Sequence, residues 1–304
     1  MTPHPRAGPG QDESLVIIFN RRALAARALR RVGLEQALRE RSLTYHIVEA
    51  DSGTEAAAAS KRAARSGYLV VAAGGDGTAR AVGNGILESG RSEAVMAHLP
   101  LGTGNDLARA LGRVGFGLEQ ALDALIEMNV RSIDVLQVNG GECCLNSMGV
   151  GFDAAVAQRR LDQQVKLPSY FPDAIRTMLH YRPQRYRVSW PDGELEGPAL
   201  MAAAMNGNCE GGGVRLAPKA NIADGLVDIY WIDPISFWQF ARYVWAVRWG
   251  RHGRLKVVRH WTTSRLTIES PTRLQYHLDG EYREMTGGGK LEIAVLPRRL
   301  RVVI

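Results

Sequence analysis

The first half of the chain alternates between short apolar runs and longer segments with helical spacing. Apolar runs of strand length occupy 14–20, 43–48, 68–75 and, with the loop that follows, 93–102. Segments of helical composition lie at 23–41, 54–67, 79–89 and 105–112. Thr54 is expected to cap the second helix, and Gly67 to end it. Strands that alternate with helices predict a parallel α/β sheet, which we assign to residues 14–136.

After residue 132 the pattern changes to short strands separated by turn residues. Examples are the segments SIDVLQVNG, YRVSWPDGELEG and LEIAVLP. This pattern is typical of an antiparallel sandwich or barrel, and we assign a β-sandwich domain to residues 137–304. Helical interruptions are expected around 154–181 and 235–250. The apolar stretch 298–304 reads as a last strand, which is a candidate to return to the first domain.

Length and cysteine content limit the class of protein. A chain of 304 residues is long enough for one large or two smaller domains. It has no apolar run of about 18 residues, so no transmembrane helix is expected. Residues 1–13 lack the regions of a signal peptide and are expected to form a disordered leader. Cys143, Cys144 and Cys209 have no metal-ligand spacing, which predicts reduced structural thiols in a cytoplasmic protein.

The stretch GGDGT, residues 74–78, stands between a predicted strand and a predicted helix. Backbone N–H groups of such a glycine turn bind phosphate well, although a tight turn without a ligand is an alternative. The stretch matches neither the P-loop nor the dinucleotide fingerprint. Asp76 would repel a polyphosphate unless a cation lay between them, so the loop indicates a nucleotide bridged by a cation such as Mg²⁺.

A second glycine loop, LPLGTGND, covers residues 99–106 and again follows a strand and precedes a helix. Loops at the carboxyl ends of parallel strands face the crevice where open α/β sheets bind ligands. The two loops are therefore expected to face the same ligand.

With these loops in place, the chain resembles the diacylglycerol kinase/sphingosine kinase catalytic-domain family, in particular its bacterial lipid kinases. The resemblance extends through NSMGVGFDA (146–154), GGGVRLAPKANIADGLVDI (211–229) and LDGE (278–281). NAD kinases and phosphofructokinases also carry a G-G-D-G element, but the later motifs favour lipid kinases.

The resemblance implies an ATP-binding α/β domain joined to a β-sandwich domain. It implies transfer of the γ-phosphoryl group of ATP, with Mg²⁺, to a hydroxyl of diacylglycerol, phosphatidylglycerol or a sphingoid or ceramide lipid. The residues that it assigns to the nucleotide are Asn20, Gly74, Gly75, Asp76, Gly77, Thr78, Ala79, Arg80, Gly102, Thr103, Gly104, Asn105 and Glu281.

The resemblance also assigns a base and a metal loop. Asp279 would accept the proton of the lipid hydroxyl, although an Asp-Gly pair is also typical of a hairpin turn. Asn221, Asp224 and Leu226 would bind a structural Mg²⁺ through oxygen atoms, and an Asx turn is the alternative.

The chain departs from the family pattern at three places. NRRALA replaces the usual Asn-Pro-x-Ser-Gly, and Arg21 and Arg22 are candidates to supply phosphate charge. Arg80-Ala81 stands where Asn-Glu is usual. The usual threonine near the end of the second strand is not assigned, because Ser52 and Thr54 both offer a hydroxyl.

The segment 235–268 contains no Asp or Glu, seven Arg or Lys residues and four of the six tryptophans. Together with the formal net charge of +7, it favours an anionic partner. One interpretation is a peripheral membrane surface, and another is aromatic residues in the core with solvated arginines. No nucleic-acid partner is expected, because no recognition motif is present. Edge strands of the sandwich leave a homodimer open.

Two other functions stay open from the sequence. One is a soluble kinase of the NAD kinase type, and the other is a nucleotide-binding regulator without catalysis. The presence of both Asp76 and Asp279 argues against the regulator, because a binding module needs no base.

Overall fold

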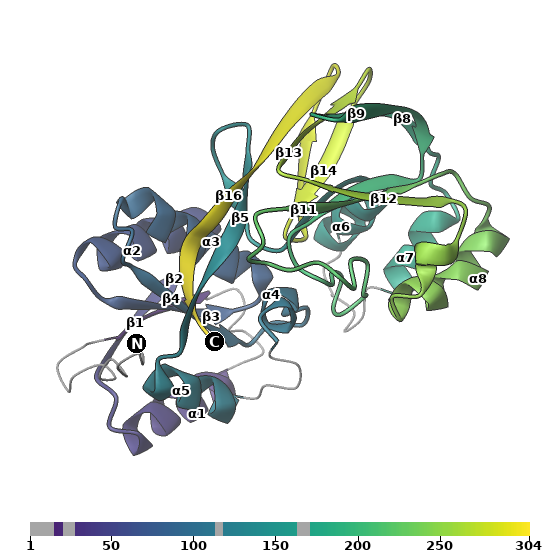
Figure 1. Cartoon of the computed structure of the whole chain (residues 1–304). Coiled ribbons are helices and arrows are strands. Elements are labelled where there is room, and N and C mark those ends of the chain that lie inside the picture. Colours follow the sequence, from purple (N-terminus) through teal and green to yellow (C-terminus); the bar gives the residue numbers. More distant parts are fainter. Residues whose placement is uncertain (1–14, 21–27, 113–117, 163–170) are drawn as a thin grey trace, which may run out of the picture. The chain divides into compact units, whose positions relative to one another are not determined.

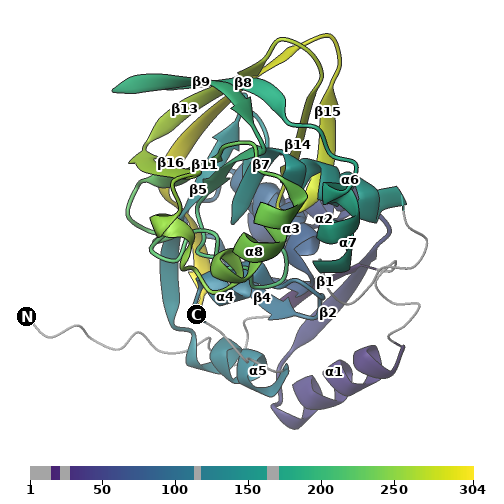
Figure 2. The same cartoon turned by 90° about the vertical axis from the view of Figure 1, so that its right-hand side faces the viewer.

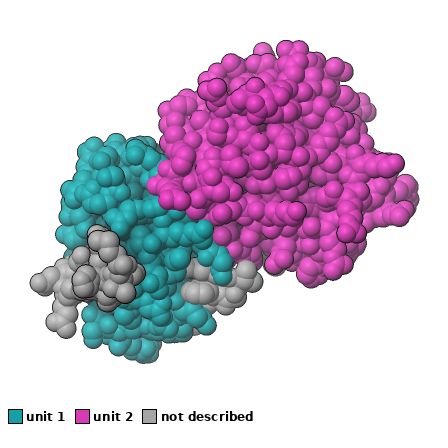
Figure 3. Space-filling view, in the orientation of Figure 1, with its two compact units in different colours: residues 1–102, 111–133, 299–304 teal, residues 103–110, 134–298 magenta. Residues whose placement is uncertain are grey.

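The computed structural model describes residues 15–20, 28–112, 118–162 and 171–304 (Figure 1). The predicted leader, Arg21 and Arg22 lie outside these described residues. The chain forms two compact units, shown in Figure 3. Unit 1 comprises residues 1–102, 111–133 and 299–304, and unit 2 comprises residues 103–110 and 134–298.

Unit 1 is built on a parallel sheet, as the alternating pattern predicts. Its strands are β1 (Leu15–Asn20), β2 (Tyr45–Ala50), β3 (Leu69–Gly74) and β4 (Val95–Pro100). They follow the order β2-β1-β3-β4, and the C-terminal end of β16 (Gly289–Val303) pairs in parallel with β4. The helices are α1 (Ala28–Glu40), α2 (Gly53–Arg65), α3 (Asp76–Ser89) and α5 (Leu118–Glu127). Apolar side chains of the sheet pack with α1 and α5 into one core.

The start of α2 differs from the prediction. Ser52, not Thr54, is the N-cap, because its side chain accepts a hydrogen bond from Glu55 N (3.2 Å). The Glu55 carboxylate accepts one in return from Asp51 N (2.8 Å). The cap lies earlier because this pair satisfies N–H groups on both sides of the first turn. Gly67 follows the helix with φ 84°, a left-handed conformation that confirms its predicted role as the stop.

Unit 2 contains two antiparallel sheets, and the predicted fold class is confirmed. The first consists of β16-β13-β8-β9, with β5 beside β16 and β6 beside β5, and it belongs to the same 10-stranded sheet as β2-β1-β3-β4; the other sheet is β12-β11-β10-β7-β14-β15. The bounds are β5 (Val130–Val138), β6 (Cys143–Cys144), β7 (Ser147–Gly151), β8 (Gln184–Trp190), β9 (Gly193–Ala199), β10 (Met201–Met205), β11 (Val227–Ile232), β12 (Val258–Thr263), β13 (Arg265–Ser270), β14 (Leu274–Leu278) and β15 (Glu281–Met285). Strands β5 and β16 contribute residues to both units.

The core of unit 2 lies between its two sheets. Val188 and Ile268 of one sheet and Met148 and Trp231 of the other belong to the same buried cluster. The helices are α4 (Asp106–Ala110), α6 (Phe152–Asp162), α7 (Phe171–Met178), α8 (Phe237–Arg248) and the short 3₁₀ helix η2 (His252–Arg254). Among the described residues, no helix is long and apolar enough to cross a membrane.

Candidate active site

In unit 1, the first glycine loop lies beside the first residues of the second loop, up to Gly102. Strand β3 ends at Gly74, Gly75 is the N-cap of α3, and Asp76 begins that helix. Leu101 N donates to Gly74 O (3.0 Å), and a Cβ on Gly75 would lie only 3.2 Å from Gly102 Cα. A Cβ on Gly74 would overlap with the side chain of Thr78. The loops therefore need glycine for their close packing.

The first turn of α3 can hold an anion through its backbone. The first N–H groups of a helix have no intrahelical acceptor, and they point where a phosphate would bind. Ala79 N already donates to Gly75 O (3.0 Å), so the helical ladder begins there. Ala79 and Arg80 are buried within unit 1, at 0% and 4% exposure. Their predicted contact with a nucleotide stays a prediction.

The other residues predicted to bind the nucleotide are distributed over both units. Asn20 ends β1, next to β3, and Gly102 belongs to unit 1. Thr103, Gly104 and Asn105 belong to unit 2, as does Glu281. Glu281 begins β15 and forms an ion pair with Arg283 (3.3 Å).

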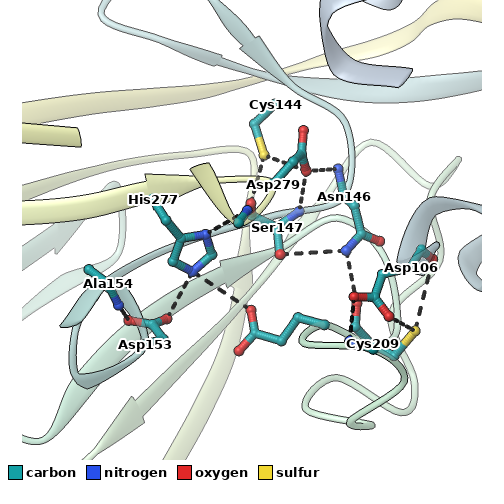
Figure 4. A network of polar contacts seen from close by, with 12 residues as sticks. Asp106, Cys144, Asn146, Ser147, Asp153, Ala154, Cys209, His277 and Asp279 are labelled. Atoms are coloured by element: carbon teal, nitrogen blue, oxygen red, sulfur yellow. Dashed lines mark hydrogen bonds and ion pairs between the residues drawn. The ribbon is translucent and has the colours of Figure 1, made fainter. Parts of the chain in front are cut away.

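In unit 2, the carboxylate of Asp279 is held by a cradle of hydrogen-bond donors (Figure 4). Oδ1 accepts from the backbone N–H groups of Asn146 (2.8 Å) and Ser147 (3.0 Å), and Oδ2 accepts from that of Leu145 (2.9 Å). The Cys144 thiol also donates to Oδ1 (3.2 Å). The carboxylate is thus fixed before any substrate binds.

Asp279 also occupies a hairpin turn, which confirms the alternative interpretation of LDGE, while its role as a base stays a prediction. It lies with Gly280 between β14 and β15, and the two residues have φ values of 48° and 80°. Positive φ at both central residues is what a tight two-residue hairpin turn requires. The turn aims the Asp279 side chain at the segment that joins β6 to β7.

A second carboxylate of unit 2 is held in the same manner. Asp106, the first residue of α4, accepts hydrogen bonds from the N–H groups of Gly212 (2.8 Å) and Gly213 (2.7 Å). Asn146 Nδ2 donates to Cys209 O (2.8 Å), and the Cys209 thiol contacts Asp106 Oδ1 (3.6 Å). The cradles of Asp106 and Asp279 therefore belong to one network, drawn in Figure 4.

The cysteines are free and buried, as predicted, but two of them do more than fill space. Cys144 donates to Asp279, and Cys209 contacts Asp106. The prediction of purely structural thiols missed these two contacts.

Next to Asp279 lies a cluster of Asp153, Glu210 and His277. His277 Nε2 is 3.2 Å from Asp153 Oδ2 and 4.0 Å from Glu210 Oε2. Gly280 N donates to His277 Nδ1 (3.2 Å), which assigns the imidazole proton to Nε2 and makes Nε2 the donor to Asp153. The other Asp153 oxygen accepts from Ala154 N (2.7 Å).

The pKa values of Glu210 and His277 in this cluster are shifted. Burial, followed by the Asp153 carboxylate, raises the pKa of Glu210 to about 7. Burial lowers the pKa of His277, but the Asp153 and Glu210 carboxylates raise it by more, so the net direction is upward. The Gly280 N–H occupies the nitrogen that a second imidazole proton would need, so we place the extra proton of the cluster on Glu210.

The spacing of the cluster would suit a metal ion, because its ligand atoms lie within 4.8 Å of one another. Its hydrogen bonds argue against one. A histidine that ligates a metal through Nε2 normally donates its Nδ1–H to an acceptor. Here Nδ1 is itself the acceptor of a backbone N–H, so Nε2 has no lone pair for a metal.

The segment ANIADGL, predicted to bind Mg²⁺, forms the Asx turn that was its alternative. Asp224 Oδ1 accepts from Leu226 N (3.0 Å), and Asn221 O accepts from Ala223 N (2.7 Å). Asn221, Asp224 and Leu226 are all exposed. Buried Asp134 anchors the loop through Gly225 N (2.6 Å). The turn does not test whether the loop binds a metal ion, so the Mg²⁺ assignment stays a prediction.

Sequence reasoning did not assign roles to Asp106, Asp153, Glu210 or His277. The first two stand within quoted motifs, GTGND and GFDA, which gave a signal that could have been used. Glu210 and His277 stand in no such pattern, and only the pairing of β7 with β14 brings His277 opposite Gly149 and next to Asp153.

Two family profiles and several curated relatives match the sequence of the chain. The sequence profile of the diacylglycerol kinase catalytic domain matches residues 14–138, and that of the YegS C-terminal NAD kinase beta sandwich-like domain matches residues 146–304. The chain is 32% identical to "probable lipid kinase YegS-like" of Pseudomonas aeruginosa, over 96% of this chain and 94% of the relative. It is 29% identical to the diacylglycerol kinase of Bacillus subtilis, over 83% of both chains.

The fold has a close counterpart among solved structures. A crystal structure of a proposed diacylglycerol kinase from Bacillus anthracis superimposes with a TM-score of 0.76 and 22% identity, over 96% of each chain. The profiles together cover most of the chain, and the identity to the Pseudomonas relative extends over nearly all of it. The protein therefore belongs to the YegS/diacylglycerol kinase family of lipid kinases.

Proposed function

We propose that the protein transfers the γ-phosphoryl group of Mg²⁺-bound ATP to a hydroxyl group of a membrane lipid, with Asp279 as the general base. The observation that carries this proposal is the cradle of Asp279. A carboxylate offers about four lone-pair positions, two on each oxygen. The two positions of Oδ1 are taken by the N–H groups of Asn146 and Ser147, whereas Oδ2 accepts one N–H group from the described residues, so Oδ2 keeps a position for a substrate hydroxyl.

Unit 1 would bind the donor. Its glycine loops carry no side chains at Gly74 and Gly75 that could cover the backbone N–H groups, and such groups at the start of a helix bind phosphate. The Asp76 carboxylate, in the first turn of α3, is a hard oxygen ligand that fits Mg²⁺ next to phosphate. When bound, Mg²⁺ would neutralise charge on the phosphates. The predicted nucleotide residues of unit 1, Asn20, Gly74 to Arg80 and Gly102, are proposed in this role, and the nucleotide contacts of Thr103, Gly104, Asn105 and Glu281 of unit 2 are proposed as well.

A second Mg²⁺ is proposed at the ANIADGL loop. The Asp224 carboxylate and the carbonyl oxygens of Asn221 and Leu226 form a donor set of oxygen atoms only, which suits a hard cation. The Asx turn already presents Asp224 on the surface. The ion would order the loop and take no part in the chemistry.

The acceptor is proposed to be a lipid with a free hydroxyl group, of the diacylglycerol, phosphatidylglycerol or sphingoid and ceramide classes. Such lipids reside in membranes, so the enzyme would work as a peripheral protein on the cytoplasmic side.

The test is incubation with labelled ATP, Mg²⁺ and a panel of these lipids in micelles. Asp279→Asn should lower turnover by roughly 10²–10⁴-fold and leave ATP binding intact, because only the proton acceptor is lost. Asp192→Asn is the matched control, since Asp192 also precedes a glycine in a hairpin turn of unit 2 but is exposed.

Three outcomes would overturn parts of the proposal. Unchanged turnover of Asp279→Asn would remove the base assignment. Transfer to NAD or to a sugar, and to none of the lipids, would replace the acceptor class. ATP binding without transfer to any acceptor would identify a regulator.

A further inference from the structure

Helix α8 is apolar on two opposite sides. Phe240 is buried, and Phe237, Val244 and Val247 pack with it against the core of unit 2. On the other side, Trp238, Trp245 and Trp249 are 79%, 58% and 62% exposed. The interpretation of aromatic residues in the core therefore holds for only part of the segment.

The three exposed tryptophans form a single stripe. Trp238, Arg242, Trp245 and Trp249 succeed one another at helical spacing, which puts them on one side of α8. Arg248 flanks the stripe and lies over the ring of Trp249 (5.5 Å). We call these five residues the tryptophan face; α8 is in the foreground in Figure 2.

These exposed side chains are carried by a well-formed helix. Ser236 and Gln239 form a reciprocal capping box, in which Ser236 N donates to Gln239 Oε1 (2.9 Å) and Gln239 N donates to Ser236 Oγ (3.3 Å). Such a cap stabilises a helix without any contribution from the tryptophans. The tryptophan face is thus presented on a helix with a stabilised start.

The segment that carries this face has charges of one sign. The segment 235–268 contains no acidic residue and seven Arg or Lys residues. A symmetric contact with a second copy would place the arginines of one face opposite those of the other. An anionic partner with an apolar layer beneath it satisfies both kinds of side chain.

We infer that the tryptophan face docks onto the surface of an anionic lipid bilayer. Tryptophan prefers the level of the lipid headgroups, where its ring is buried and its N–H stays hydrated. Arginine side chains gain from the negative potential of that surface. The inference rests on the proposed lipid substrate and names the surface by which the enzyme would reach it.

The same helix is tied to the loop that carries part of the candidate site. Arg248 donates to Gly213 O (2.6 Å), and Gly213 N donates to Asp106 Oδ1 (2.7 Å). After the helix, His252 Nε2 is 2.8 Å from Leu216 O. Docking of α8 would therefore bring this loop of unit 2 to the bilayer.

The experiment measures binding of the full chain to sedimented vesicles in the absence of ATP. Vesicles of phosphatidylcholine with phosphatidylserine are compared with vesicles of phosphatidylcholine alone. Each of Trp238→Ala, Trp245→Ala and Trp249→Ala should weaken binding to the anionic vesicles roughly tenfold. Arg242→Gln should weaken it about fivefold and reduce its salt dependence. The matched controls are Ile126→Ala, an exposed apolar residue of unit 1, and Arg185→Gln on β8.

A kinase assay separates this inference from the proposed function. The tryptophan variants should keep wild-type activity on a short-chain diacylglycerol dissolved as monomers and lose activity on vesicles. Wild-type vesicle binding by all three variants would overturn the docking inference while leaving the kinase proposal intact. Conversion of a dimer into a monomer by these variants, without any vesicle binding by the wild type, would also overturn it, in favour of a second copy. Vesicle binding without phosphorylation of any lipid would support docking and contradict the kinase proposal.

Discussion

At the scale of single residues, Glu210 should give the protein a characteristic pH dependence. Its pKa rises from 4.5 to about 7 on folding, so between these values the folded protein holds a proton that the unfolded chain has released. Stability therefore falls as the pH rises from about 4.5 to 7, by at most about 3 kcal/mol.

Glu210→Gln should flatten this dependence. The variant should gain about 2–3 kcal/mol in free energy of unfolding relative to the wild type between pH 5 and pH 8. Urea denaturation across that range measures the effect. Glu194→Gln, at an exposed position of β9, is the control. Stability curves of Glu210→Gln and the wild type that stay parallel would show that Glu210 does not carry the proton.

Gly149 should be essential because of one neighbour. A Cβ on Gly149 would overlap with Asp153 Oδ2, and the three nearest atoms to it all belong to Asp153. Gly149→Ala should therefore cost about 1–3 kcal/mol in the wild type and much less in an Asp153→Ala background. A double-mutant cycle measured by denaturation provides the coupling energy. Additive costs would mean that the clash is relieved elsewhere.

Individual site residues differ in how far the sequence could reveal them. The sequence offered a hairpin turn at Asp279 as the alternative to a catalytic base, and the structure shows the turn, because Asp-Gly is a local turn signal. The donors that hold the Asp279 carboxylate lie more than 130 positions away in the chain, and no local pattern encodes them. The same holds for Glu210, whose pKa depends on burial and on Asp153.

At the scale of elements, the crossing of α2 and α3 depends on Gly85. A Cβ at Gly85 would overlap with the backbone oxygen of Ala57 and lie 2.8 Å from Ser60 Cβ. Gly85→Ala should therefore lower the free energy of unfolding by about 3 kcal/mol, although alanine favours a helix. Gly33→Ala in α1 is the matched control, because no atom lies within 4 Å of its Cβ position. It should stabilise by about 0.5–1 kcal/mol. Thermal unfolding of both variants measures these changes in stability. A Gly85→Ala variant that is more stable than the wild type would contradict the tight crossing of α2 and α3.

Periodicity predicted the elements that have a clear apolar pattern and missed those that do not. The buried strands β1 and β3 are continuous apolar runs, and the sequence placed both. Strand β15 was not predicted as a separate strand, because all five of its residues are at least partly exposed and no apolar alternation marks it. Strand β12 was missed because it lies in the basic aromatic segment, where composition masked the strand pattern. Composition also could not tell which tryptophans of that segment face solvent.

At the scale of the whole molecule, the last residues of the chain return to unit 1 and add a strand to its sheet. Residues 299–304 belong to unit 1, where Arg301 and Val302 pair with β4 and Ile304 N donates to Asn129 O (2.7 Å). The buried side chain of Val303 joins the same core cluster as Ile17 and Val71. The sequence marked residues 298–304 as a candidate to return to the first domain, but it did not reveal β4 as the partner, because that pairing joins residues far apart in the chain.

Because the two units have separate core clusters, a substitution that destabilises one unit should leave the stability of the other unchanged. The cluster that contains Val303 draws only on unit 1, and the cluster between the two sheets draws only on unit 2. Val303→Ala should destabilise unit 1 by about 2 kcal/mol, and its β1, β3 and β4 amides should exchange hydrogen roughly 30-fold faster. Amides of β10 and β11 should keep their wild-type rates, and Arg299→Ala, at an exposed position, should change neither set. Equal acceleration in both units would mean that they unfold as one cooperative body, with β5 and β16 transmitting the loss from one core to the other.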